Sequence, residues 1–145
     1  MEALEMKMRT KHLENVLFLP FQPRELFSEM LAAADLSLVT LNANSALSSM
    51  PSKVFNVMAS ARPILSVAPD GSELMQIVTE AGCGWNVPPQ SPEKLAEAIL
   101  QLKAREPALI QMGQNGRMSL EKNYSRRHCV DAYEKMLTTL CSQLN

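Results

Sequence analysis

Short apolar runs alternate along this chain with longer stretches of helical periodicity. The apolar runs have the length and continuous hydrophobic character of buried parallel strands, and they cover residues 15–19, 36–41, 63–67 and 83–87. The longer stretches place apolar residues three or four positions apart, as amphipathic helices do. This alternation predicts an α/β fold with a doubly wound parallel sheet, followed by C-terminal helices.

Glycines and small polar residues mark the ends of the predicted helices. Ser72 and Ser125 stand at N-cap positions, and Gly82 follows the end of one helix. Gly113 and Gly116 fall inside another helix and are expected to weaken it. The predicted helices cover residues 2–13, 23–34, 51–59, 72–81, 91–102, 107–122 and 125 to the end.

The size and charge of the chain exclude several classes of protein. Its 145 residues are enough for one domain with a buried core. The formal net charge of −1 gives no electrostatic reason to expect a nucleic-acid partner. No run approaches the ~18 apolar residues that a membrane-spanning helix needs, and Met1–Lys11 lacks the pattern of a secretory signal. We therefore expect a single domain over residues 1–145.

Cysteine and histidine are too few and too scattered to indicate a metal site. Cys83, Cys129 and Cys141 form no Cys-x-x-Cys pair, and His12 lies far from His128 in the sequence. We expect no metal and no disulfide framework, but the reduced, buried thiols of a cytoplasmic protein.

Ligands of doubly wound sheets bind beyond the carboxyl ends of the strands, so three loops are candidates for a site. These loops cover residues 20–22, 42–53 and 68–73. In the second loop, Ser52 and Lys53 stand at a helix N-terminus, where free N–H groups and the helix dipole favour an anion such as a phosphate. The residues alone leave another interpretation open, in which Ser52 only caps the helix and Lys53 is a solvated surface side chain.

Residues 50–65, Met-Pro-Ser-Lys-Val-Phe-Asn-Val-Met-Ala-Ser-Ala-Arg-Pro-Ile-Leu, resemble the C-terminal domain of group 1 (family 4) glycosyltransferases of the GT-B fold. The branch they resemble most is that of bacterial polysaccharide synthesis, whose pattern contains Pro-Ser-Lys. The likeness extends to residues 15–23, 31–41, 71–74, 81–85, 112–113 and 123–125. Its specificity lies in the combination of these pieces.

This resemblance implies a Rossmann-like domain that binds a nucleotide-diphosphate sugar, the donor substrate of sugar transfer, without a cofactor. Ser52 and Lys53 would face the diphosphate. Glu73 would approach the donor sugar or its phosphates, or would only favour the dipole of its own helix. The remaining donor-binding residues hold the base edge, shape the Glu73 loop or face the ribose: Pro20, Phe21, Gln22, Ser72 and Asn56. No catalytic residue is assigned.

Three positions depart from the family pattern. The two glutamates of the family, separated by seven residues, fall at Ser48 and Asn56. Asn56 replaces a glutamate that holds the ribose hydroxyls. We expect weaker donor binding or a different nucleotide, because an amide lacks the strength of a charge-assisted hydrogen bond. Ala61 stands where glycine is usual, from which we expect a turn that avoids positive φ.

The larger departure is at the N-terminus, where family members begin with a strand and a glycine-rich turn. This chain begins inside the helix that follows, so we expect a truncated donor-binding domain that lacks its first strand and its N-terminal acceptor-binding domain. Strands 16–19 and 63–67 are then expected to lie side by side, or to have the gap between them filled by another chain.

The leading hypothesis is the donor-binding half of a glycosyltransferase, a hexosyl or related transferase that is inactive without its N-terminal domain. The resemblance implies a polysaccharide or lipid-linked acceptor and a cytoplasmic location, with peripheral association of the full-length protein at the inner face of the membrane. One alternative is a degenerate, non-catalytic α/β interaction or binding module, which Asn56 keeps open. Another is a receiver-like domain, which needs acidic residues at strand ends that here hold Pro20, Thr40 and Ala68.

Overall fold

Three parallel strands form the centre of this protein, whose computed structural model describes residues 2–41 and 50–143. The strands lie in the order β1-β2-β3 and are joined by helices that run back across the sheet. The strands and the helices packed on them are β1 (Ser37–Thr40), α3 (Lys53–Ala59), β2 (Ile64–Val67), α4 (Glu73–Glu80), β3 (Gly84–Val87), α5 (Pro92–Lys103) and α6 (Glu106–Asn123). The predicted α/β fold with a parallel sheet is confirmed.

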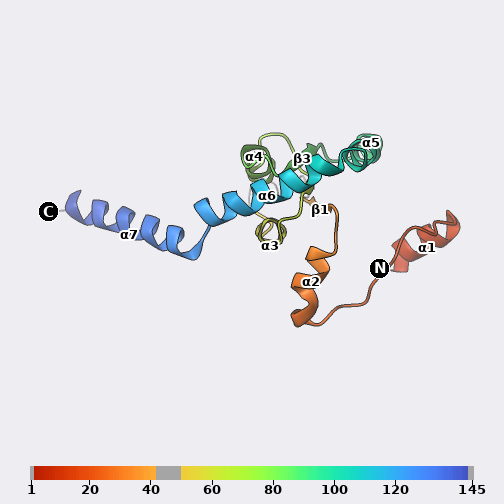
Figure 1. Ribbon diagram of the computed structural model, residues 1–145, viewed down its shortest axis with the longest axis horizontal. Coiled ribbons are helices and arrows are strands. Elements are labelled where there is room, and N and C mark those ends of the chain that lie inside the picture. The colour runs from red at the N-terminus through yellow and green to blue at the C-terminus, as the bar shows by residue number, and fades with distance from the viewer. Residues whose placement is uncertain (1, 42–49, 144–145) are drawn as a thin grey trace.

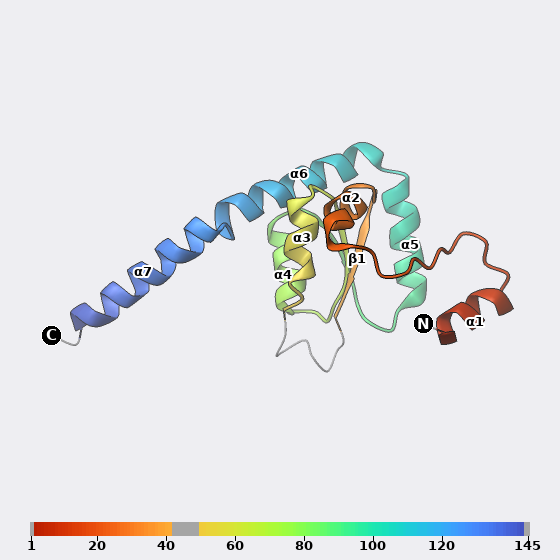
Figure 2. The same ribbon diagram turned by 90° about the horizontal axis from the view of Figure 1, so that it is seen from below.

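Helices cover the sheet on both faces (Figures 1 and 2). On one face, Val54 and Met58 of α3 and Leu74 of α4 are buried in one cluster with Ile64 of β2. On the other face, Leu102 of α5 is buried in a second cluster that also contains Leu65 and Val87. Neighbouring residues of a strand point to opposite faces, which is why Ile64 and Leu65 belong to different clusters.

Helix α6 crosses the amino edge of the sheet, opposite the edge at which the strands end (Figure 2). A side-chain carbon at Gly113 would lie 2.0 Å from the carbonyl oxygen of Ala61, and one at Gly116 would lie 3.0 Å from Cβ of Cys83. The two glycines expected to weaken this helix are therefore what allows it to approach the ends of α3 and α4. The Arg117 guanidinium adds a hydrogen bond to the carbonyl of Ala59.

The turn that ends α3 contradicts one expectation. Ala61 has φ +53°, in the left-handed region that the sequence was expected to avoid. The N–H of Ala61 donates to the Met58 carbonyl (3.1 Å) and that of Arg62 to the Val57 carbonyl (3.3 Å). This pair of bonds is a Schellman motif, which satisfies two helix-end carbonyls and requires a left-handed residue at this position. Alanine adopts it at a cost of roughly 1–2 kcal/mol.

Residues 15–19 contradict the strand prediction. They form no strand, and most of their side chains are exposed, Leu17 at 79%. The neighbours of β2 are β1 and β3, so residues 16–19 do not lie beside it. An apolar run becomes a strand only when another strand supplies hydrogen-bond partners, and no strand of the described residues pairs with this segment.

Four helical segments lie around this body and bury no residue: α1 (Glu2–Thr10), η1 (Arg24–Leu26), α2 (Phe27–Ala32) and α7 (Arg126–Gln143). The predicted helix at 23–34 is thus divided into a short 3-10 turn and a short α-helix. Helices α1 and α7 lie at opposite ends of the molecule (Figure 2). None of the helices in the described ranges is both long and apolar enough to cross a membrane.

The cysteines fulfil the expectation of buried thiols only in part. Cys83 is fully buried, whereas Cys129 and Cys141 are exposed on α7. All three are free thiols. The two on α7 are exposed because that helix extends away from the sheet instead of packing on it (Figure 1).

Candidate functional site

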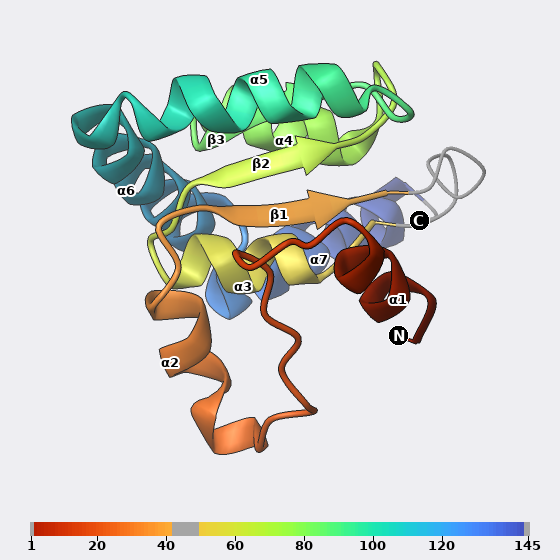
Figure 3. The same ribbon diagram turned by 90° about the vertical axis from the view of Figure 1, so that its right-hand side faces the viewer.

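The carboxyl edge of the sheet brings together the start of α3 and the start of α4. Strands β1 and β2 point toward the same edge (Figure 3), and each following helix must begin there to run back over the sheet. Because α3 and α4 share one buried cluster, their N-termini emerge from the same face of the fold. Two of the three candidate loops therefore lead into this edge. The first part of one of them, residues 42–49 with Ser48, lies outside the described residues.

The first turn of α3 divides into a buried face and an exposed face. Val54 and Val57 are buried, whereas Ser52, Lys53 and Asn56 are exposed. The helical spacing of three and four residues places these three polar side chains on one face. The hydroxyl of Ser52 makes no capping hydrogen bond, so the interpretation of this serine as a simple cap is not supported.

The ammonium group of Lys53 carries a full positive charge at this helix start. Lys53 forms no ion pair with any residue in the described ranges. Its charge adds to the positive end of the α3 dipole. The N–H groups of Val54 and Phe55 already donate to the carbonyls of Pro51 (3.0 Å) and Ser52 (3.2 Å), so the side chains are the groups left for a ligand. The arrangement suits an anionic ligand at the carboxyl edge.

The loop between β2 and α4 is ordered by its own hydrogen bonds. The N–H of Ser72 donates to the Pro69 carbonyl (3.1 Å) across a tight turn in which Gly71 has φ +75°. The Ser72 hydroxyl then accepts the N–H of Met75 (3.3 Å) and caps α4. Ser72 is therefore buried and occupied in the structure of the loop, while Glu73 directly after it is exposed.

A pair of hydrogen-bonded polar side chains next to this loop, the buried Ser66 and the partly buried Asn86, was not identified from the sequence. The Ser66 hydroxyl on β2 donates to the side-chain oxygen of Asn86 on β3 (2.7 Å), and the Asn86 amide donates to the carbonyl of Ala68 (3.1 Å). Ser66 is 0% exposed. The available signal was a polar residue in each of two apolar strands, Ile-Leu-Ser-Val and Gly-Trp-Asn-Val. Such residues stay buried only when they are hydrogen-bonded.

The third candidate loop is not brought to this edge. Phe21 is fully exposed (101%), and the Gln22 amide donates to the Pro20 carbonyl (2.9 Å) in an exposed turn. In Figure 3 the connection between α1 and α2 first crosses in front of α3 and then turns away from the sheet before it reaches α2. The structure therefore groups Ser52, Lys53, Asn56, Ser72 and Glu73, and leaves Pro20, Phe21 and Gln22 apart from them.

The side chains of Cys83 and Tyr124 each have a raised pKa. Burial raises the pKa of the Cys83 thiol to about 11. Burial also raises the pKa of Tyr124, as do the charges of Glu80 and Glu73. The Tyr124 ring packs on Phe55 of α3 with centroids 4.9 Å apart, so the end of α6 supports the helix that carries Lys53. Both groups remain neutral near pH 7.

Across residues 2–41 and 50–143, no set of three or more His, Cys, Asp or Glu side chains is placed to hold a metal ion.

A cleft of about 780 Å³ lies at the amino edge, between the starts of β1 and β2 and helices α5 and α6. It is lined by Asp35, Arg62, Lys103 and Glu106 among others, and by none of the residues predicted for the site. It is therefore separate from the carboxyl edge.

These features define an α/β domain of the doubly wound class, with the exposed side chains of Ser52, Lys53 and Glu73 at the carboxyl edge of a parallel sheet. The family model of group 1 glycosyl transferases matches residues 2–119. The chain therefore belongs to the group 1 glycosyltransferase family. It is 36% identical over 113 residues to the probable glycosyltransferase WbjE of Pseudomonas aeruginosa, a match that covers 78% of this chain.

The fold matches part of a GT-B glycosyltransferase. Sucrose-phosphate synthase from Thermosynechococcus elongatus superimposes with a TM-score of 0.79 at 20% sequence identity, over 98% of this chain. This likeness concerns the fold alone. The chain spans 28% of the length of the WbjE relative and 34% of that of the synthase.

Proposed function

We propose that this chain binds a nucleotide-diphosphate sugar at the carboxyl edge of its sheet, as the donor-binding half of a glycosyltransferase. The observation that carries the proposal is the meeting of two elements at that edge. One is the exposed face of α3 with Ser52, Lys53 and Asn56, and the other is the ordered loop that leads to Glu73. Membership of the group 1 family supports this class of ligand.

Each group has a role that follows from its chemistry. The Lys53 ammonium, which lies at the positive end of the α3 dipole, neutralises the diphosphate, and the Ser52 hydroxyl donates to a phosphate oxygen. The Glu73 carboxylate accepts hydrogen bonds from sugar hydroxyls. Asn56 offers the ribose a neutral hydrogen bond, weaker than that of a carboxylate. These groups position the donor and stabilise the departing nucleotide, which is how such a site contributes to transfer.

Calorimetry with UDP-, GDP- and dTDP-sugars tests this site. We expect one of these donors to bind the wild-type chain and Lys53→Ala to weaken its affinity by about tenfold or more, because a hydrogen bond to a charged group is lost. The matched control is Lys103→Ala, which removes the same charge at the amino edge and is expected to change affinity by less than about twofold.

Two results would count against the donor site. One is the absence of binding by every nucleotide sugar, which would favour the alternative of a non-catalytic interaction module. The other is an equal loss of affinity in the Lys53 and Lys103 variants, which would indicate non-specific attraction of anions.

We further propose that sugar transfer needs a second, acceptor-binding domain, and that the acceptor is a polysaccharide or lipid-linked saccharide at the cytoplasmic face of a membrane. The family resemblance supports these assignments. A stripe of exposed apolar side chains along α7, at Val130, Tyr133, Leu137 and Leu140, offers a surface for such a domain. The 145-residue chain should bind the donor without releasing nucleotide in a coupled assay. Turnover by this chain alone would contradict the need for a second domain.

A further inference from the structure

Asn86 joins two parts of the fold that the proposed site uses together. It lies on β3, and its side chain extends to the first residue of the loop between β2 and α4. The amide nitrogen donates to the carbonyl of Ala68 (3.1 Å), and the Ala68 N–H donates to the carbonyl of Val87 (3.2 Å). The start of this loop is therefore held at both its N–H and its carbonyl.

Ser66 fixes the Asn86 side chain in turn. Ser66 and Asn86 are partners in the parallel register of β2 and β3, so their side chains project on the same face of the sheet. Ile64 of the same strand and Ala68 just beyond its end belong to the cluster under α3 and α4, which places Ser66 on that face. The 2.7 Å bond from the Ser66 hydroxyl to the Asn86 oxygen leaves the amide nitrogen directed at Ala68.

Between Ala68 and the exposed Glu73, further hydrogen bonds hold the loop. The Pro69–Ser72 turn is closed by its hydrogen bond, and the Gln76 amide donates to the Gly71 carbonyl (3.2 Å). The Ser72 cap then joins the turn to α4. Because these bonds connect the loop to α4, we expect a displacement of Ala68 to displace Glu73 as well.

We propose that Asn86 is a positioning residue for donor binding, which acts through the loop of residues 68–73 and does not itself touch the donor. This inference rests on the proposed function. Holding the loop in one conformation before binding removes the entropy cost of ordering it when the phosphates and sugar arrive. Ser66 is buried and Asn86 is partly buried, and the two side chains are hydrogen-bonded, so the pair does not carry the cost of unsatisfied polar groups.

The test compares Asn86→Leu, which removes the tether but keeps the number and branching of the side-chain heavy atoms, with Ser66→Ala and Ser66→Thr. The probes are the UDP-, GDP- and dTDP-sugars, with the corresponding nucleoside diphosphates, because Glu73 at the end of this loop is proposed to bind the sugar. For the nucleotide sugar that binds the wild-type chain tightest, Asn86→Leu should weaken affinity about tenfold, which corresponds to the loss of one or two hydrogen bonds. Ser66→Ala should have a smaller effect, and Ser66→Thr, which keeps the hydroxyl, should bind like wild type. Affinity for the nucleoside diphosphate, which lacks the sugar, should change by less than about twofold.

Leu102→Ala controls for a general loss of stability, because Leu102 is buried under the opposite face of the sheet. It should lower the unfolding midpoint without changing affinity well below that midpoint. Amide hydrogen exchange at Gly71, Ser72 and Glu73 gives an independent readout: Asn86→Leu and Ser66→Ala should accelerate it, and Leu102→Ala should not.

The outcomes separate this inference from the proposed function. Nucleotide-sugar binding unchanged in Asn86→Leu, or equally weakened in Leu102→Ala, overturns the positioning role while the donor site stands. If the wild-type chain binds none of the nucleotide sugars, the donor site fails and the positioning role fails with it. If Asn86→Leu does not fold, Ser66→Ala and its threonine counterpart decide the question.

Discussion

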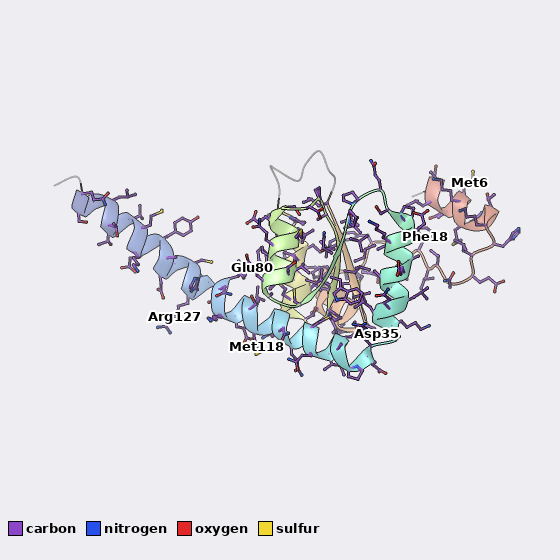
Figure 4. All side chains as sticks on the ribbon, turned by 90° about the horizontal axis from the view of Figure 1, so that it is seen from above. Met6, Phe18, Asp35, Glu80, Met118 and Arg127 are labelled. Carbon is purple, nitrogen blue, oxygen red and sulfur yellow. The ribbon has the colours of Figure 1, made fainter. Side chains whose placement is uncertain are left out.

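Two regions of the molecule differ in how they are packed. The helices α3 to α6 pack on the sheet around buried clusters, whereas the outer helices α1, α2 and α7 bury no residue. Figure 4 shows side chains crowded around the sheet, whereas Met6 lies on α1 at one end of the molecule and α7 extends outward from Arg127. All fully buried side chains of the described residues belong to the first region or its connections. Helical periodicity is therefore enough to predict a helix, but only burial against another element attaches it to the fold.

The same contrast divides the candidate site. Ser52, Lys53 and Asn56 follow from the packing of α3, and the capped start of α4 places Glu73. The residues predicted to hold the base edge, Pro20, Phe21 and Gln22, lie in the connection between α1 and η1. This connection contributes no residue to either buried cluster. Only the first group has positions determined by the core.

The largest effect on the free energy of unfolding is expected from a substitution at Gly113, where α6 contacts the end of α3. Gly113→Ala places a methyl group 2.0 Å from the Ala61 carbonyl oxygen, so α6 must move away from the body. We expect a loss of more than about 4 kcal/mol in the free energy of unfolding, because the clash is with backbone and cannot be relieved by a rotamer. Urea unfolding followed by circular dichroism measures it. The control is Gly71→Ala, where the space is open and only the positive φ opposes the change, at a cost of about 1 kcal/mol. Equal effects would contradict the close approach of α6.

A smaller difference is expected between leucines of the two regions. Leu74 of α4 is fully buried, and Leu137 of α7 is 56% exposed. Leu74→Ala should lower the free energy of unfolding by about 3 kcal/mol, because it removes buried surface and leaves a cavity. Leu137→Ala should change it by less than about 0.5 kcal/mol. A cost at Leu137 close to that at Leu74, measured in the same urea experiment, would show that α7 packs against the body in solution.

The smallest of the three effects is a dependence of stability on alkaline pH. The thiol of Cys83 has its pKa raised by burial from 9.0 to about 11. The unfolded chain therefore loses this proton at a lower pH than the folded chain. The resulting stability is fully present below pH 9 and declines as the pH rises to about 11, by roughly 2 kcal/mol.

Urea titrations from pH 7 to pH 11 on the wild type and Cys83→Ala isolate this contribution, because other groups titrate alike in both. The wild type should lose more stability than the variant across this range. Identical pH profiles would mean that the Cys83 thiol is accessible to water. Cys129 and Cys141 on α7 are exposed, so replacing them with alanine should leave the profile unchanged.

The elements that the sequence predicted well are those whose signals are local. Ser72 caps its helix as expected, and Gly82 ends it with φ +58°. The strand at residues 15–19 was wrong because its apolar run carries no information about whether a partner strand is available. Ala61 was wrong for a related reason: the Schellman motif and the contact with Gly113 hold it in a conformation that its own side chain disfavours.

By itself, the sequence determined the class of fold, the family and the helix start that carries Ser52 and Lys53, because these depend on periodicity, capping and a contiguous motif. Only the tertiary structure decided which elements share a face, that α6 needs glycine where it crosses α3, and that Ser66 and Asn86 hold the loop before Glu73. The physical reason is the separation of the partners along the chain. Ser66 and Asn86 are twenty positions apart, and no local pattern indicates that the register of two strands will place one beside the other.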